Sequence, residues 1–372
     1  MQFPNQKRNL IHIYLESIEN SYFNKELGGN MDDNLMPNIA KLSKEGISFS
    51  HLDKGKGYGG ALDAYGCNWS VASMVNQFFG VPMKAPSSRN NYGKAGNFLP
   101  GAVGIGDILE KMGYEQTMMI GADSDFGGLT YMFQDHGNFK IMDHKYALDN
   151  DMLPSKNYSV KWGYEDEKLY KFAKDELTRL ANTGKPFHFL MENADTHAPG
   201  LVFDGDVPDF TTLRRTFDYG KTIRFSEKHV YEFVKWIMEQ PFYENTTVVI
   251  IGDHLSMDSF FFFENDFSNF TRTTYNLILN PSENVKSVDE SRFYNRKWTS
   301  YDFMPTILSA LGVKFESDIL GVGTNLFSSS PTLFERDGYK EVNDYFLRKS
   351  IYYNEKLLNG KNNYNGDNLS LY

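Results

Sequence analysis

The sequence predicts an α/β fold in which a mostly parallel central sheet carries helices on both faces. Two observations lead to this prediction. Stretches with the apolar spacing of an amphipathic helix alternate with short runs of consecutive apolar residues. Strands that are covered on both faces of a parallel sheet have this continuous apolar character, and alternating strands and helices build such a sheet.

The elements follow one another along most of the chain. The first apolar run ends at Glu16, and the run at 247–251 (TVVII) is the richest in β-branched residues, which favour strands. The predicted strands are 9–15, 114–120, 187–191, 247–251 and 275–279. The predicted helices are 36–46, 69–79, 105–112, 164–181, 226–238 and 301–311.

No convincing linker divides the chain, so we predict a single domain over residues 1–330. After about residue 330 the sequence becomes mixed, aromatic and rich in asparagine. We therefore expect residues 331–372 to form a small C-terminal extension packed on the same core. The sequence contains no apolar run near the roughly 18–20 residues that span a bilayer.

The composition excludes several classes of protein. Of the 372 residues, 41% are hydrophobic and 15% aromatic, which is enough to bury a large core and excludes a disordered chain. The 38 basic and 48 acidic side chains give a net charge of −10 without an extended basic run, which argues against a nucleic-acid partner. Cys67 is the only cysteine, so a metal would need oxygen and imidazole ligands.

Acidic and imidazole side chains follow several of the predicted strands. Ligands of such sheets bind beyond the carboxyl ends of the strands. Asp253 and His254 leave the 247–251 strand together and could share one divalent cation such as Mn²⁺ or Zn²⁺, or could be a helix cap and a packed neighbour. Glu16 could join them or lie at the surface, as we expect of Glu19. Other candidates at this edge are Asp123, Asp125, Glu192, Asp195 and His197.

Ser70 lies at the opening of the predicted helix 69–79. It could be an ordinary N-cap, which is the commonest role of a serine at that position. The free N–H groups and the positive dipole end of a helix also favour an alkoxide and an incoming phosphate, and a metal would lower the pKa of the hydroxyl further. Both interpretations are compatible with the same geometry.

Four motifs in a fixed order resemble one known family. They are YLES at 14–17, W-S/T-x-x-x-M-V from Trp69, GVP at 80–82 and GDH at 252–254. Together they resemble the extracellular catalytic domain shared by lipoteichoic acid synthase and the phosphoglycerol transferases, a branch of the alkaline phosphatase and sulfatase superfamily. The resemblance covers roughly residues 8–330. It implies that Glu16, Ser70, Asp253 and His254 bind one Mn²⁺, with Mg²⁺ or Zn²⁺ as alternatives.

The resemblance also implies an activity. Ser70 would be the nucleophile and His197 a substrate-binding histidine beside the metal. The reaction would move glycerol phosphate from a phosphatidylglycerol-like lipid to a surface glycan or glycerophosphate polymer. Relatives hold this domain on the extracytoplasmic face of the bacterial membrane by N-terminal helices, so the start MQFPNQKRN leads us to expect an anchor that is missing here.

Two positions depart from the family pattern. The family nucleophile is usually threonine, whereas position 70 is serine. Relatives place a cation against the substrate phosphate at the position that we align with Leu129, so another cation would be needed, with Arg89 and Lys140 as candidates. We expect the run 260–263 (FFFF) to be core or site wall, with contact to lipid chains as the alternative.

Other functions remain open. A phosphodiesterase or phosphatase of the same superfamily would use the same groups, and so would a phosphoethanolamine transferase, although such transferases usually carry several disulfides. A sulfatase would need C/S-x-P-x-R, which the residues after Cys67 lack. Outside enzymes, an inactive domain that binds glycerophosphate polymers is the alternative.

Overall fold

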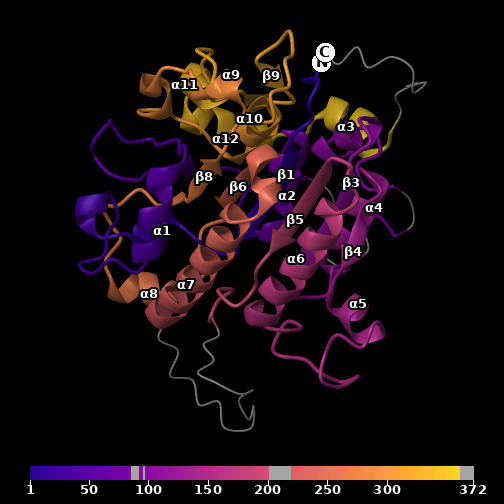
Figure 1. Cartoon of the computed structure of the whole chain (residues 1–372). Helices are drawn as coiled ribbons and strands as arrows, with labels where there is room; N and C mark the ends of the chain where they lie inside the picture. Colours follow the sequence, from indigo (N-terminus) through magenta and orange to yellow (C-terminus); the bar gives the residue numbers. More distant parts are fainter. Residues whose placement is uncertain (85–91, 95–96, 201–218, 361–372) are drawn as a thin grey trace.

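A six-stranded sheet forms the centre of the molecule. The computed structural model describes residues 1–84, 92–94, 97–200 and 219–360. The strand order is β4-β3-β5-β1-β6-β8, and only β8 runs antiparallel to its neighbour, β6. The predicted α/β fold with a mostly parallel sheet is therefore confirmed (Figure 1). The strands are β1 (Asn9–Leu15), β3 (Glu115–Ile120), β4 (Lys140–Met142), β5 (Phe187–Glu192), β6 (Thr246–Gly252) and β8 (Asn276–Leu279).

The middle strand, β1, shows why a continuous apolar run predicts this sheet. All seven of its residues are buried, because alternate side chains enter two different cores. Leu10 and Tyr14 belong to the core that contains side chains of α2 and α10. Ile11 and Ile13 belong to the core under α1, α6 and α7 on the opposite face.

Helices cover both faces of this sheet, as predicted. The described helices are α1 (Pro37–Leu42), α2 (Ser70–Phe79), α3 (Ile105–Lys111), α4 (Leu129–Asp135), α5 (His144–Asp149), α6 (Asp166–Ala181), α7 (Tyr219–Met238), α8 (Ser259–Glu264), α9 (Glu283–Lys286), α10 (Phe303–Ala310), α11 (Leu333–Asp337) and α12 (Tyr339–Leu347). Two small antiparallel sheets pair β2 (Ala61–Leu62) with β7 (Thr273–Thr274) and β9 (Ile319–Leu320) with β10 (Gly323–Thr324).

Several elements differ from their predicted limits for local reasons. The α1 helix ends four residues early, where the Ser43 hydroxyl donates to the Ile39 carbonyl at 2.8 Å and a 3₁₀ turn follows. The α7 helix is already formed at Tyr219, seven residues before its predicted start, because Thr222 and Ser226 occupy its buried face and hide the apolar period. The strand β4 has three residues, too few for a period to show.

The segment after residue 330 packs on the loop that precedes α2. Phe334 and Val342 are buried against Ala64, Cys67 and Tyr301 in a small separate core. Within the described ranges, no helix is both long and apolar enough to cross a membrane.

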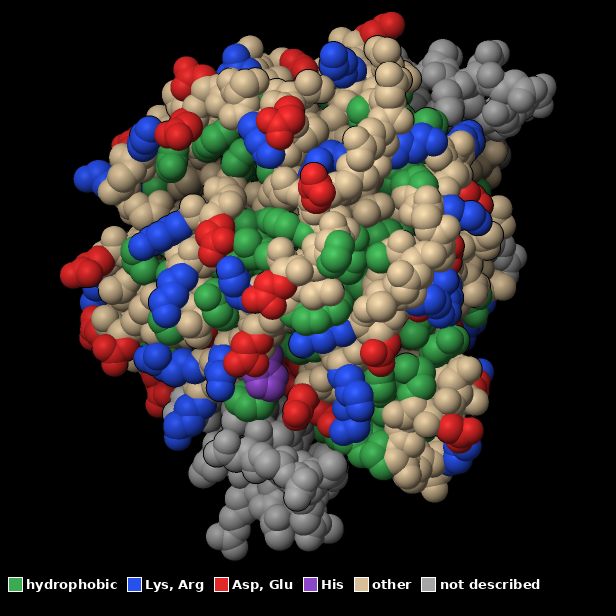
Figure 2. All heavy atoms as spheres, viewed as in Figure 1, with side chains coloured by type: hydrophobic (Ala, Val, Ile, Leu, Met, Phe, Trp, Pro, Cys, Tyr) green, Lys and Arg blue, Asp and Glu red, His purple; other side chains and the backbone are tan. Residues whose placement is uncertain are grey.

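Charges of both signs are mixed over the surface. Figure 2 shows basic and acidic side chains interspersed on one face, with hydrophobic side chains between them. An anionic ligand on this face would therefore be held by particular groups rather than by a field of one sign.

Candidate metal centre and nucleophile

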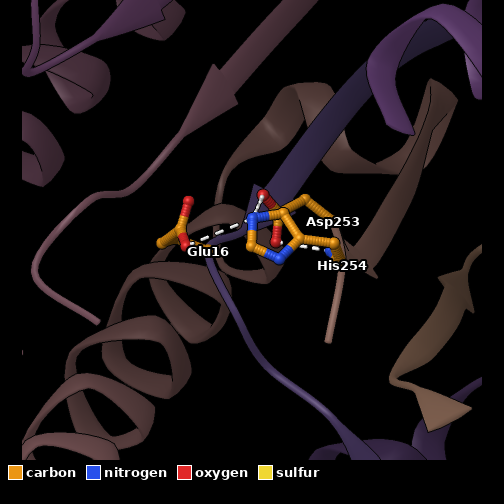
Figure 3. A group of neighbouring side chains, drawn as sticks. All are labelled: Glu16, Asp253 and His254. Atoms are coloured by element: carbon orange, nitrogen blue, oxygen red, sulfur yellow. Dashed lines mark hydrogen bonds and ion pairs between the residues drawn. The ribbon is translucent and has the colours of Figure 1, made fainter. Parts of the chain in front are cut away.

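Two neighbouring central strands bring the acidic and imidazole groups together. Because β1 and β6 pair in parallel with Leu15 opposite Gly252, Glu16 and the Asp253–His254 pair leave the sheet side by side. A Cβ atom at position 252 would lie 1.8 Å from the Ile18 carbonyl oxygen, so only glycine allows this close approach. The three side chains point toward one another in Figure 3.

The predicted nucleophile lies against the same group. The Ser70 hydroxyl donates to Glu16 Oε2 at 3.1 Å and lies 3.5 Å from His254 Nε2. His254 Nε2 is 3.5 Å from Glu16 Oε1 and 3.3 Å from Asp253 Oδ2. Ser70 is the first residue of α2 and Trp69 is the N-cap, so the Ser70 side chain makes no capping bond and faces the acidic group.

Burial concentrates charge at this point. Glu16, Asp253 and His254 are 3%, 2% and 1% exposed. Burial and the Glu16 carboxylate raise the pKa of Asp253 to about 7, although His254 opposes this rise. Burial lowers the pKa of His254, but the carboxylates of Asp253 and Glu16 outweigh it and raise the pKa to about 9. Two carboxylates and an imidazole share a nearly dry space.

These residues fit a divalent cation. One ligand atom from each of Glu16, Asp253 and His254 lies within 4.8 Å of the others. Asp253 Oδ2 is buried and has no hydrogen bond, and its described neighbour is the His254 ring nitrogen at 3.3 Å, so this carboxylate oxygen is available to a cation inside the group. Oxygen ligands with a single imidazole suit Mn²⁺, Mg²⁺ or Zn²⁺.

Backbone groups hold the candidate ligands in place. Ser17 has a left-handed conformation with φ of 56°, and its N–H donates to Asp253 Oδ1 at 2.7 Å. The N–H of Glu16 donates to the side-chain oxygen of Asn193 at 2.9 Å. A strained turn directly after Glu16 thus connects the ends of β1, β5 and β6.

Glu19 does not lie at the surface, and our expectation for it was wrong. Its side chain is fully buried and accepts from Arg272 Nε at 2.8 Å and from Arg272 Nη2 at 2.5 Å. It also accepts from the Ser256 N–H at 3.0 Å, two residues beyond His254. The chain turns inward at Ser17, which brings Glu19 beneath the loop after β6. The Glu19–Arg272 pair therefore holds that loop against the end of β1.

His197 lies on the loop after β5, and the residue before it contacts Glu16. The hydroxyl of the preceding residue, Thr196, donates to the Glu16 carbonyl at 2.5 Å. The His197 ring packs on Trp162 with 4.6 Å between ring centres, and its Nδ1 lies 3.1 Å from the Ala198 carbonyl oxygen. Its role as a substrate-binding histidine beside the metal stays a prediction.

A lysine that the sequence did not reveal lies next to His197. Lys161 Nζ donates to the His197 carbonyl at 3.0 Å. Burial lowers the pKa of Lys161, against the attraction of the Asp195 and Glu16 carboxylates. The ammonium group therefore lies within electrostatic reach of the Glu16 carboxylate. The only sequence signal for it is its position before Trp162 in the loop that leads to α6.

The other cation candidates have different surroundings. Leu129 is buried at the start of α4, and Lys140 on β4 forms an ion pair with Glu176 at 3.2 Å. Lys140 lies on the edge strand of the sheet and is paired with Glu176, so it is not the cation sought beside the substrate phosphate. Arg89 lies outside the described residues.

The remaining acidic candidates support the site or lie apart from it. Glu192 is buried at the end of β5, and burial together with Asp253 and Glu16 raises its pKa far above the ordinary value. Asp195 accepts from the Asp166 N–H at 3.1 Å and so holds its loop. Asp123 and Asp125 share a turn after β3, where the Asp125 N–H donates to Asp123 at 2.9 Å.

The phenylalanine run and the cysteine have distinct roles. In α8, Phe261 is in the core as expected, whereas Phe260 and Phe263 are 64% and 84% exposed, so that part of the prediction was wrong. Cys67 is buried and accepts from Asn76 Nδ2 at 2.9 Å and from Ser300 Oγ at 3.0 Å. Burial raises the pKa of this thiol to about 11.

Known proteins are similar to this chain in sequence and in fold. A sulfatase family model matches residues 8–313. Phosphoglycerol transferase I of Salmonella paratyphi B is 29% identical over 265 residues. The matched residues cover 69% of this chain and 32% of that protein, so the chain spans about a third of the length of such relatives. A protein in the alkaline phosphatase superfamily from Vibrio parahaemolyticus has a TM-score of 0.63 at 21% identity, covering 91% of this chain and 72% of that one.

The lipoteichoic acid synthase LtaP from Listeria monocytogenes has a TM-score of 0.61 at 18% identity, covering 87% of this chain and 77% of that chain. Both solved structures share the fold. The family resemblance predicted from the four motifs is confirmed. The chain belongs to the sulfatase family.

Proposed function

We propose that the protein is a metal-dependent glycerophosphotransferase. The donor is a phosphatidylglycerol-like lipid, and the acceptor is a cell-surface glycan or a glycerophosphate polymer. The observation that carries the proposal is the convergence of Ser70 Oγ, Glu16, Asp253 and His254 at one buried point. The similarity to phosphoglycerol transferase I supports glycerophosphate as the transferred group.

The four converging residues would hold Mn²⁺, with Mg²⁺ or Zn²⁺ as alternatives. A bound cation would supply Lewis-acid stabilisation of charge on the phosphate. Ser70 begins α2, so the positive end of the helix dipole lies at its hydroxyl and favours the alkoxide form.

The transfer takes place in two displacements. In the first, Ser70 Oγ bonds to the donor phosphorus, the bond from phosphorus to the diacylglycerol oxygen breaks, and the serine proton ends on that oxygen. His197 orients the departing oxygen and carries the proton to it. In the second, an acceptor hydroxyl oxygen bonds to phosphorus, the bond to Ser70 breaks, and the acceptor proton returns to Ser70 Oγ.

Lys161 would supply the cation that the family pattern leads us to seek near Leu129. Its ammonium group has one described hydrogen bond, to the His197 carbonyl, and its other donors can meet a phosphate oxygen. The exposed side chains of Phe260 and Phe263 follow His254 closely in sequence, and they would meet the acyl part of the donor. We propose that the domain 1–330, with its extension 331–372, works on the extracytoplasmic face of the bacterial membrane on an N-terminal anchor.

The test is the replacement of Ser70 in the Mn²⁺-loaded protein. With a fluorescent phosphatidylglycerol analogue as donor, we expect Ser70→Ala to lower the cleavage rate by about a thousandfold or more. Ser70→Thr keeps the hydroxyl and is the matched control, which should remain active. If Ser70→Ala binds Mn²⁺ and still cleaves the donor at the wild-type rate, the nucleophile assignment is wrong.

The same assay separates transfer from the alternatives. A phosphodiesterase or phosphatase releases glycerol phosphate to water whether or not a glycan is present. A transferase adds the mass of glycerol phosphate to the glycan. An inactive binding domain would cleave no donor.

A further inference from the structure

A polar cavity lies beside the N-terminus of α2. Its volume is about 360 Å³, within the roughly 300–1,000 Å³ of small-ligand sites. One wall is the loop that leads to α2, and the other is the start of α12. The side chains that matter here are Asp63, Tyr65, Asn68, Trp69, Tyr339 and Asn343.

The C-terminal segment builds one wall of this cavity and is fixed to the other. Asn343 accepts from the Tyr65 N–H at 2.7 Å and donates to the Tyr339 carbonyl at 2.9 Å. Beneath these contacts, Phe334 and Val342 are buried against the loop that precedes α2. The cavity therefore exists only where the segment after residue 330 is present.

The cavity reaches toward the nucleophile. Asn68 and Trp69, which line it, directly precede Ser70. Burial raises the pKa of Asp63, whereas the Ala64 N–H and the charges of Arg272 and His254 lower it. Burial also raises the pKa of Tyr339, and the Asp63 carboxylate adds a smaller increase. A ligand in the cavity would lie between the start of α12 and the two residues that precede Ser70.

The side chains of the cavity suit a neutral, hydroxyl-rich ligand. Trp69, Tyr65 and Tyr339 line the cavity, and aromatic side chains can pack on the C–H faces of a sugar ring. Asp63 accepts and Asn68 both accepts and donates, which matches a set of hydroxyl groups. Among the described residues that line the cavity there is no Lys or Arg, and the Asp63 carboxylate would repel an anion.

We propose that this cavity binds the carbohydrate acceptor, and that the C-terminal segment completes the acceptor site. The inference rests on the proposed transferase function and specifies where its second substrate lies. A sugar hydroxyl held between Asp63 and Trp69 would face the glycerophosphoryl group on Ser70. Its oxygen then bonds to phosphorus, the bond to Ser70 Oγ breaks, and its proton passes to that Oγ.

Direct binding tests the inference without the donor. The probes are neutral oligosaccharides of glucose, galactose or N-acetylglucosamine, titrated calorimetrically into the Mn²⁺-loaded full chain. We expect at least one probe to bind, and Tyr339→Ala to weaken its binding by about three- to tenfold through loss of the aromatic surface. Tyr339→Phe keeps the ring and should bind normally. Tyr345→Ala is the matched control, because Tyr345 lies on the same helix and is 51% exposed against 50% for Tyr339.

Transfer kinetics provide the second readout. Tyr339→Ala should cleave the donor in water at the wild-type rate, while the acceptor concentration for half-maximal transfer rises by the same factor as the dissociation constant. Asn68 is exposed on the opposite wall, and Asn68→Ala should also raise the acceptor concentration for half-maximal transfer. If no probe binds, or if Tyr339→Ala binds and transfers like wild type, the inference is overturned. A wild-type protein that cleaves no donor would refute the proposed function, and the binding result would still decide whether the cavity takes carbohydrate.

Discussion

Breaking the buried Glu19–Arg272 pair should destabilise the protein strongly. In the intact pair the Glu19 side chain is fully buried and the Arg272 side chain is 24% exposed. Arg272→Met would leave the Glu19 carboxylate buried without its cationic partner. Removing one partner of a buried ion pair costs about 3–5 kcal/mol. Because Ser256 N–H still donates to Glu19, we expect the lower end, about 3 kcal/mol.

Urea unfolding followed by tryptophan fluorescence measures this change. The midpoint should fall with an unchanged slope. The double variant Glu19→Gln with Arg272→Met removes both charges and should be less destabilised than Arg272→Met alone. Lys54→Met breaks the exposed pair with Glu290, in which the side chains are 65% and 67% exposed, and should change stability by less than about 1 kcal/mol.

The expected loss has a consequence at the metal centre. Arg272 Nη2 also donates to the Ser256 carbonyl at 2.7 Å, so the pair fixes the backbone just beyond His254. Mn²⁺ affinity should therefore fall together with stability in Arg272→Met. A loss below about 1 kcal/mol, or a double variant as unstable as the single one, would refute the description of this pair as a buried clamp.

Three further changes test the site. Saturating Mn²⁺ should raise the free energy of unfolding of the wild type, by about 2.7 kcal/mol at a hundred times the dissociation constant. It should have little effect on the stability of Glu16→Gln. Equal stability shifts for the two proteins in calorimetry would exclude Glu16 as a ligand. Lys161→Met should lower the rate of donor cleavage by about tenfold to a hundredfold, and Lys161→Arg should restore that rate. Lys156 is exposed, so Lys156→Met should leave the rate unchanged. Replacing Phe260 and Phe263 by serine should reduce cleavage of donor in vesicles but not of a short-chain soluble donor; an equal reduction for both would argue against a lipid contact.

The central sheet and the grouping of the candidate metal ligands could be predicted from the sequence because both depend on local patterns. A buried parallel strand leaves a run of apolar residues, and β1 and β6 each deliver their polar groups at the first positions after such a run. Glu16, Asp253 and His254 could therefore be grouped before their positions were known. Ser70 was a candidate because it opens a predicted helix, and the family resemblance joined it to these three residues.

Contacts between loops left no comparable signal. Glu19 and Arg272 are separated by 253 positions in sequence, and the turn at Ser17 that joins them depends on a left-handed residue other than glycine. Lys161 meets His197 through two loops whose paths are set by tertiary packing. The wall formed by Tyr339 belongs to the segment with the weakest pattern in the chain.

The environment of Cys67 bears on where this chain can remain intact. With a pKa of about 11, roughly one thiol in ten thousand is ionised at neutral pH, and the ionised form is the one that oxidants and disulfides attack. The sulfur is also enclosed by Asn76 and Ser300 beneath the C-terminal segment. Burial and the raised pKa of Cys67 therefore both slow the attack of oxidants on this thiol.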